Sequence, residues 1–131
     1  LGMPSIFTRI IQGELPAYTI AENEDCYAFL DINPNARGHV LCVPKKEVDK
    51  LFDLDDDLYI KLMQFSKHIA GALKKAVSCK RVGMAVVGLE VPHAHVHLIP
   101  LNEMHEMTFQ TKVKLSDEDF KELVTKIKAQ L

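Results

Sequence analysis

A chain of 131 residues has the length of one domain, and 47% hydrophobic with 26% charged residues is the balance of a globular protein with its own core. Sixteen basic and eighteen acidic residues give a net charge of −2. This excludes a protein built to neutralise long runs of nucleic-acid phosphates, but not one that holds a small anion in a pocket. No apolar run is long enough to cross a bilayer, so we expect no membrane contact.

The cysteines predict a reducing compartment. Cys26, Cys42 and Cys79 are odd in number, and no two are close in sequence. We expect no secretory leader before them. Free thiols of this kind are typical of cytoplasmic proteins, so we expect a cytoplasmic location.

The first half of the chain predicts one short helix and three strands. Ser5 begins a helix whose apolar positions are Ile6, Phe7, Ile10 and Ile11, and Gly13 ends it. Apolar and β-branched runs then predict strands at 18–21, 26–30 and 39–43. The last of these follows a connection rich in Asn, Pro and Gly.

The second half predicts two helices that flank two strands. Apolar residues recur at helical spacing over 55–78, and Ser116 begins a final helix with an apolar face. Strands are expected at 82–87 and 94–98. The fold class is therefore α+β: about five antiparallel strands with helices packed on the sheet, and a helix at the C-terminus.

The segment from Val91 to Pro100 carries the strongest functional signal. Side chains at alternate strand positions point the same way, so His93, His95 and His97 are expected to share one face. Each imidazole needs a hydrogen-bond partner and titrates near neutral pH, so a fold has little structural reason to align three.

Two other interpretations compete with catalysis. Alternate residues lie about 6.6 Å apart along a strand, so one zinc ion cannot reach all three histidines without strain. A metal bound by two of them, completed by His39 or His105, stays open. A solvated strand face that merely contains histidines is the second alternative.

The catalytic interpretation assigns the attack to the central histidine. A backbone carbonyl or a neighbour can hold the Nδ1 proton and leave Nε2 free as a nucleophile towards phosphorus. Imidazoles on either side can donate to phosphate oxygens, where negative charge gathers in the transition state. His95 is the residue with a helper on each side.

These residues resemble the histidine-triad family, whose signature is His-φ-His-φ-His-φ-φ, where φ is apolar. The resemblance extends over residues 5 to about 101. It includes the N-terminal segment at 5–17, the Phe-Leu-Asp-Ile-Asn-Pro run at 29–34, and the run from Gly38 to Lys46.

The resemblance implies a role for each site residue. His95 becomes nucleotidylated, His97 and His93 assist, and His39 completes the histidine cluster. Asp31 accepts hydrogen bonds from the ribose hydroxyls, although a turn carboxylate that caps Asn33 is the competing interpretation. Six apolar residues form the pocket expected for a purine base: Ile6, Phe7, Ile10, Phe29, Leu30 and Ile32. Plain core packing is the competing interpretation of these residues.

The resemblance also implies a symmetric homodimer and chemistry that requires no cofactor or metal. A Cys-x-x-Cys zinc site found in some members is not expected, because Ser5 and Thr8 occupy those positions. We expect a histidine-triad domain over 5–110 and a C-terminal extension with a helix over 111–131.

One departure from the family pattern bears on mechanism. Relatives often place a hydroxyl residue before the triad, and this chain has Glu90 there. We expect Glu90 to face the leaving group, as a proton donor or as partner to a cationic amine, unless it simply turns to solvent.

The resemblance predicts a hydrolase that cleaves a nucleoside phosphoramidate or a related nucleotidyl bond. The alternatives are a dinucleoside polyphosphate hydrolase of the Fhit-like branch and a nucleotide-binding protein with little catalysis. A zinc-binding module is a further alternative.

Overall fold

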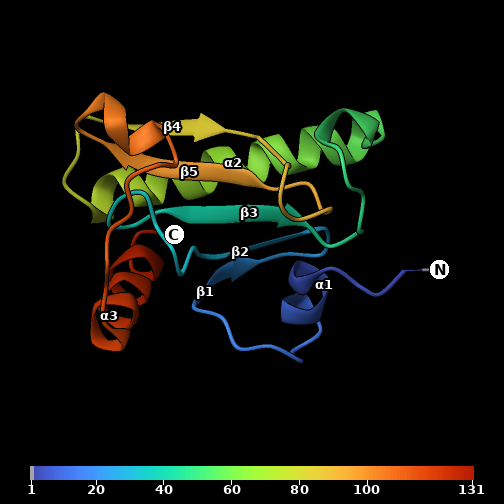
Figure 1. Cartoon of the computed structure of the whole chain (residues 1–131), viewed down its shortest axis with the longest axis horizontal. Coiled ribbons are helices and arrows are strands. Elements are labelled where there is room, and N and C mark those ends of the chain that lie inside the picture. The colour runs from blue at the N-terminus through green and yellow to red at the C-terminus, as the bar shows by residue number, and fades with distance from the viewer. Residues whose placement is uncertain (1) are drawn as a thin grey trace.

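Five strands form one antiparallel sheet in the order β1-β2-β3-β5-β4 (Figure 1). The structure is a computed structural model that describes residues 2–131. The strands are β1 Thr19–Glu22, β2 Cys26–Leu30, β3 Val40–Pro44, β4 Arg81–Ala85 and β5 Val96–Leu101. The helices are α1 Ile6–Ile11, α2 Asp56–Ala76 and α3 Asp117–Lys128, with short 3-10 turns η1 Leu51–Asp53 and η2 Met104–Met107. The predicted α+β class is confirmed.

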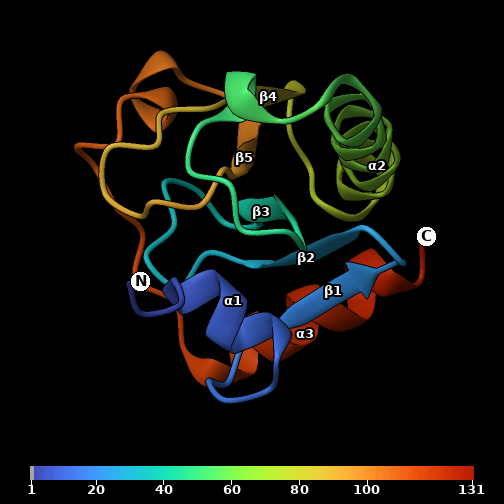
Figure 2. The ribbon, with the colours of Figure 1, turned by 90° about the vertical axis from the view of Figure 1, so that its right-hand side faces the viewer.

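The two faces of the sheet are covered by different helices. Alternate residues of β2 and β3, including Ala28 and Cys42, pack with α2 and α3 in the larger core. The intervening residues, including Phe29 and Leu41, pack with Phe7 of α1 in a smaller core. Figure 2 shows α1 and α2 on opposite sides of the sheet. Burial on both faces explains why the sequences of β2 and β3 are apolar throughout.

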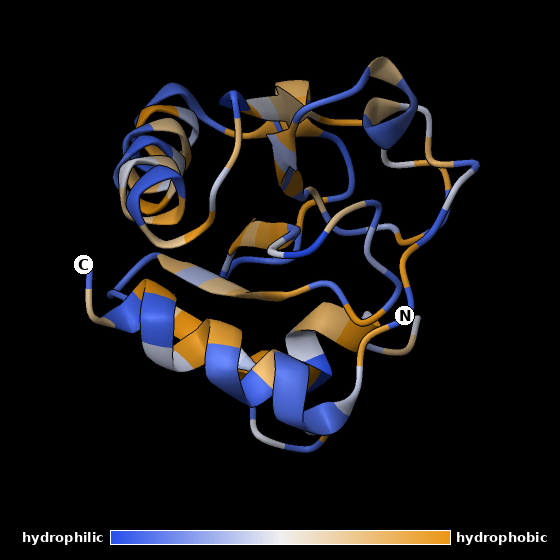
Figure 3. Cartoon of the chain, turned by 90° about the vertical axis from the view of Figure 1, so that its left-hand side faces the viewer, coloured by the Kyte–Doolittle hydropathy of each residue, from blue (hydrophilic) through white to orange (hydrophobic). Residues whose placement is uncertain are grey.

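Side chains that satisfy free backbone N–H groups fix where the long helices begin. The Asp55 carboxylate accepts from the Leu58 amide at 2.8 Å, and Ser116 with Asp119 forms a capping box at α3. Both helices mix hydrophilic and hydrophobic residues along their length, as amphipathic helices do (Figure 3). Of the helices described, none has the length and apolar character needed to span a membrane.

The turn before β3 depends on Gly38. Its φ of +93° is in the left-handed region, and a Cβ there would lie 3.0 Å from the Val77 side chain. This turn brings His39, directly after the glycine, to the start of β3.

The expected strand at 94–98 differs from the structure at its start. β5 begins at Val96, so His93 and His95 lie in the preceding loop, and the expectation that three histidines share one strand face is wrong. Pro92 has no backbone N–H to donate to a neighbouring strand of the sheet. The backbone N–H of Ala94 donates to the Val48 carbonyl at 2.7 Å, outside the sheet. The loop therefore aims the imidazoles of His93 and His95 independently of His97, which lies on β5.

Candidate active site

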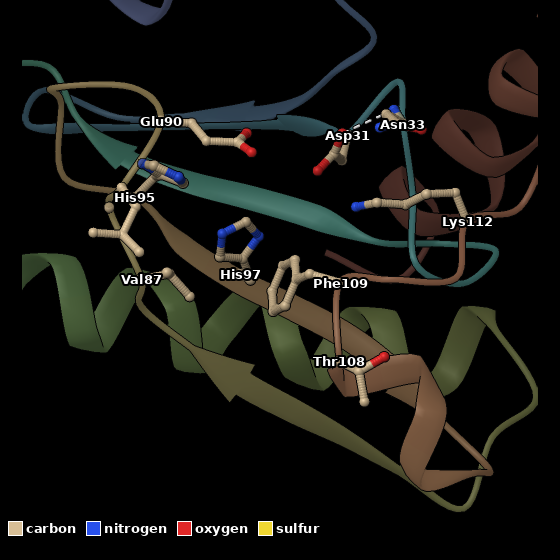
Figure 4. Close-up of a pocket in the computed structure, with 11 residues that line it drawn as sticks. Asp31, Asn33, Val87, Glu90, His95, His97, Thr108, Phe109 and Lys112 are labelled. Carbon is tan, nitrogen blue, oxygen red and sulfur yellow. Dashed lines mark hydrogen bonds between the residues drawn. The ribbon is translucent and has the colours of Figure 1, made fainter.

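His95 is held in one tautomer by the backbone. Its Nδ1 lies 2.7 Å from the His93 carbonyl oxygen, and a carbonyl only accepts, so Nδ1 carries the proton. In the neutral ring Nε2 is therefore unprotonated. The side chain is 7% exposed and lines two cavities that share several residues, and Figure 4 shows the larger of the two. This is the arrangement that the catalytic interpretation requires of a nucleophile.

A chain of hydrogen bonds fixes the protons on His39 and His97. The backbone N–H of Asn35 donates to His39 Nδ1 at 3.0 Å. His39 is therefore protonated at Nε2, and this atom donates to His97 Nδ1 at 2.9 Å. His97 then keeps its own proton on Nε2. Burial lowers the pKa of His39 to about 3 and that of His97 to about 4, so both rings are neutral at pH 7.

His93 acts on the site through its backbone. Its ring is fully buried, with Nε2 donating to the Pro44 carbonyl at 2.7 Å and Nδ1 accepting from the Ser5 hydroxyl at 2.7 Å. Burial lowers its pKa, which favours this neutral form. The ring is absent from the lining of both cavities that His95 lines. His93 thus supplies the carbonyl that holds His95, not an imidazole beside the ligand.

A polar cluster ties His93 to the start of α1; we call Ser5, Thr8, Glu47 and His93 the Ser5 cluster. The Glu47 carboxylate accepts from the Ser5 amide at 2.7 Å and from the Thr8 hydroxyl at 2.6 Å. These bonds, that from Thr8 above all, lower the pKa of Glu47. The Ser5 hydroxyl also accepts from the Thr8 amide at 3.0 Å. Ser5 and Thr8 of this cluster are the residues at the two positions where some family members carry a Cys-x-x-Cys zinc site.

The smaller of the two cavities is an apolar slot of about 220 Å³. Phe7 and Phe29 contact each other edge to face, with ring centroids 5.4 Å apart. All six residues expected to form a base pocket line it: Ile6, Phe7, Ile10, Phe29, Leu30 and Ile32. Phe7 and Phe29 are also buried in the smaller core, so both interpretations of them have structural support.

Asp31 lies between the slot and the larger cavity. One carboxylate oxygen accepts from the Asn33 amide at 2.9 Å, which is the turn contact that competed with a ribose role. The other lies 3.6 Å from His39 Nε2. Burial raises the pKa of Asp31. The turn contact leaves acceptor positions for a ligand, because a carboxylate offers about four.

The larger cavity has a volume of about 390 Å³ and shares four residues with the slot: Asp31, Glu90, His95 and His97. Figure 4 shows the Glu90 carboxylate directed into the cavity near His95. Glu90 thus faces a space that His95 also lines.

Within residues 2–131, one group of side chains has the types and spacing of a metal site. The ligating atoms of Asp31, His39 and His97 all lie within 4.8 Å of one another. The His39 proton already occupies the Nδ1 lone pair of His97. A cation would have to displace that proton, so the geometry fits the hydrogen-bonded chain without a metal.

Comparisons with known proteins agree with this geometry. A family model described as the HIT domain matches residues 12–104. This chain belongs to the HIT family. The histidine-triad resemblance seen in the sequence is thereby confirmed.

Named and solved HIT relatives cover most of the chain. An uncharacterized HIT-like protein of Borreliella burgdorferi is 37% identical over 131 residues, covering 93% of this chain and 94% of its own. The adenosine 5′-monophosphoramidase HNT1 of Saccharomyces cerevisiae is 38% identical over 101 residues, covering 76% of this chain but 64% of the yeast protein. A crystal structure of a Hit-like protein from Bartonella henselae has a TM-score of 0.85 at 31% identity, covering 97% and 96% of the two chains.

Several residues that line or support the site were not singled out by the sequence. Asn35 orients His39, and Thr108, Phe109 and Lys112 line the larger cavity. The last three lie beyond the 12–104 match to the HIT domain, in a segment without regular structure. Asn35 carried a weak signal, because it lies in the Asn-Pro-Asn turn directly before Gly38 and His39.

Proposed function

We propose that this HIT protein is a hydrolase that cleaves a nucleoside phosphoramidate or a related nucleotidyl bond through a nucleotidyl intermediate on His95. The observation that carries the proposal is the 2.7 Å contact of His95 Nδ1 with the His93 carbonyl, which leaves Nε2 free beside both cavities. The similarity to a yeast protein named as an adenosine 5′-monophosphoramidase supports the choice of bond.

The first step forms a bond between His95 Nε2 and phosphorus. The P–N bond of the substrate breaks, its electron pair stays on the leaving nitrogen, and that nitrogen takes up a proton from Glu90 or from solvent. The Nε2–H of neutral His97 donates to a phosphate oxygen as charge gathers there. Water then attacks phosphorus and releases a proton to solvent, the P–Nε2 bond breaks with its electron pair returning to Nε2, and the nucleoside monophosphate leaves with His95 restored.

The nucleoside occupies the slot and the adjoining carboxylate. The apolar lining, with Phe7 and Phe29, suits the face of a purine base. Asp31, which lies in both cavities, accepts the ribose hydroxyls. Phosphorus then lies at the junction, where His95 and His97 line both spaces.

The central experiment compares two substrates with the purified protein. Adenosine 5′-phosphoramidate is expected to give AMP and ammonia faster than a diadenosine polyphosphate is cleaved. The variant His95→Asn should bind AMP with an affinity close to wild type and turn over neither substrate. Binding without turnover in the wild type would favour a nucleotide-binding protein. Faster cleavage of the polyphosphate would favour a dinucleoside polyphosphate hydrolase.

Glu90 is proposed to serve the leaving group. As a proton donor it would protonate the departing amine, and as a carboxylate it would pair with a cationic one. The variants Glu90→Gln and Glu90→Ser should lower kcat and alter its pH dependence. Wild-type turnover across the pH range in both variants would remove Glu90 from the mechanism.

The family resemblance also supports three proposals about the whole molecule. We propose that it is a homodimer, that it works in the cytoplasm, and that residues 111–131 extend a domain spanning 5–110. Sedimentation at several concentrations would measure the assembly. A monomer at every concentration would contradict the first of these proposals.

A further inference from the structure

A segment beyond the HIT-domain match covers one side of the larger cavity; we call Thr108–Val113 the cavity strap. The Val113 amide donates to the Pro34 carbonyl at 2.9 Å, which fastens the strap to the turn before β3. Phe109 has a φ of +63°, a conformation that non-glycine residues seldom adopt. Its ring lies edge to face against His97, with centroids 4.7 Å apart. The strap is therefore built against the site and held there.

Lys112 of the strap is anchored by a buried side chain. Its Nζ donates to Asn35 Oδ1 at 2.8 Å and lies 5.3 Å from the centroid of the Phe109 ring. Asn35 is 2% exposed, and its Nδ2 donates to the Glu106 carbonyl at 2.9 Å, which fixes the oxygen towards Lys112. A surface lysine usually extends freely into solvent, whereas this one points into the cavity (Figure 4).

The charge of Lys112 is unusual for its surroundings. It is the one lysine or arginine among the described residues that line either cavity, and the acids that line them are Asp31 and Glu90. Within residues 2–131, no carboxylate lies within 4.0 Å of its Nζ, which has three N–H donors and gives one to Asn35. Two of its N–H donors therefore make no hydrogen bond within residues 2–131, and they are available to a ligand in the cavity that Lys112 lines.

We propose that Lys112 binds an oxyanion on the leaving group, either a carboxylate or a further phosphate. This inference rests on the proposed function, in which the base fills the slot, Asp31 holds the ribose and His95 attacks phosphorus. The rest of the larger cavity then receives the leaving group. Glu90 would repel an anion there, and Lys112 offsets that repulsion. Lys112 therefore raises kcat/KM for nucleotidyl compounds with a negatively charged leaving group, compared with the same protein without that positive charge.

Three substrates in matched variants test this selection. They are adenosine 5′-phosphoramidate, AMP joined through phosphorus to the amine of glycine, and diadenosine triphosphate. In Lys112→Met, the ratio of kcat/KM for an anionic leaving group to that for ammonia should fall at least tenfold. Lys112→Arg should keep most of the ratio, and Lys114→Met, an exposed neighbour outside the cavities, should keep all of it.

The arms of the experiment separate the sources of the oxyanion and the competing explanations. If the kcat/KM ratio falls for the glycine compound, the oxyanion that Lys112 binds is a carboxylate. If the ratio falls for the triphosphate, that oxyanion is a phosphate. An equal loss for all three substrates would overturn the proposal, because Lys112 would then act through Asp31 or through folding. An unchanged ratio would overturn it as well.

A binding measurement keeps this test independent of turnover. In the His95→Asn background, calorimetry should give a larger affinity loss on Lys112→Met for the glycine conjugate than for adenosine. If no substrate is turned over but this difference appears, the proposed reaction fails and the Lys112 site stands. Equal affinity losses for the two ligands would overturn the Lys112 site itself.

Discussion

The Nδ1 atom of His95 lies 2.7 Å from the carbonyl oxygen of His93. The bond joins two residues of the triad through the backbone of one and the ring of the other. It fixes the proton of His95 on Nδ1 and leaves Nε2 unprotonated in the neutral ring, while the ring of His93 is engaged by Ser5 and Pro44. The first histidine of the triad thus positions the second.

Weakening the Ser5 cluster should lower turnover more than binding. Ser5→Ala removes the hydroxyl that donates to His93 and caps α1, so the loop that carries the His93 carbonyl should lose order. We expect kcat to fall several-fold, the Kd for AMP to change by less than twofold, and stability to fall by about 1 kcal/mol.

Ser5→Thr is the matched control, since it keeps the hydroxyl and should recover most of kcat. Stopped-time assays, calorimetry and thermal melts provide the three measurements. A wild-type kcat in Ser5→Ala would contradict the prediction that the Ser5 cluster positions His95.

Stability should fall in acid because His39 and His97 are buried in neutral form. An ordinary histidine of the unfolded chain protonates near pH 6.5, whereas the pKa values of these two in the folded protein are about 3 and about 4. Between those values the unfolded state binds more protons, so the free energy of unfolding rises with pH and is lost as pH falls from 6.5 towards 4.

The loss should be on the order of 3 kcal/mol for each of the two histidines at pH 4. Urea unfolding at pH 7, 5.5 and 4 measures it. His97→Gln should give a shallower dependence on pH, and His68→Gln, at an exposed position on α2, should leave the dependence as in wild type. If the free energy of unfolding changed with pH equally in the wild type and both variants, the claim that His39 and His97 are buried in neutral form would be contradicted.

Asp31→Asn should abolish discrimination for the ribose hydroxyls. The amide oxygen can still cap the Asn33 amide, so the turn should survive, but the charge-assisted hydrogen bonds to the diol are lost. We expect AMP to bind roughly tenfold more weakly, while the affinity for 2′,3′-dideoxy-AMP stays within twofold. Titration of both nucleotides into both proteins measures this. Equal weakening of the two nucleotides would assign Asp31 to the turn alone.

Periodicity predicted most of the fold. The apolar spacing over 55–78 places both ends of α2 within two residues, and Ser116 places the start of α3 within one residue. The two-residue alternation over 93–97 was misleading, because Pro92 and the Ala94 contact with Val48 hold that segment outside the sheet. Alternation alone does not report whether a partner strand is available.

The sequence predicted which residues lie at the site where a family motif marks them. His95, Asp31 and the six apolar residues lie together at the cavities as the resemblance implied. The anchoring of Lys112 by the Asn35 side chain depends instead on a contact between positions 77 residues apart. In sequence Lys112 belongs to a polar stretch without periodicity, which gives no sign of the cavity that it faces.

The most direct test of the central claim is a rapid-quench reaction with adenosine 5′-phosphoramidate, followed by mass spectrometry of the digested protein. The account predicts a peptide containing His95 that carries one added nucleoside monophosphate, present in the wild type and absent from His95→Asn. Turnover without any such adduct, or an adduct on another residue, would contradict nucleophilic attack by His95.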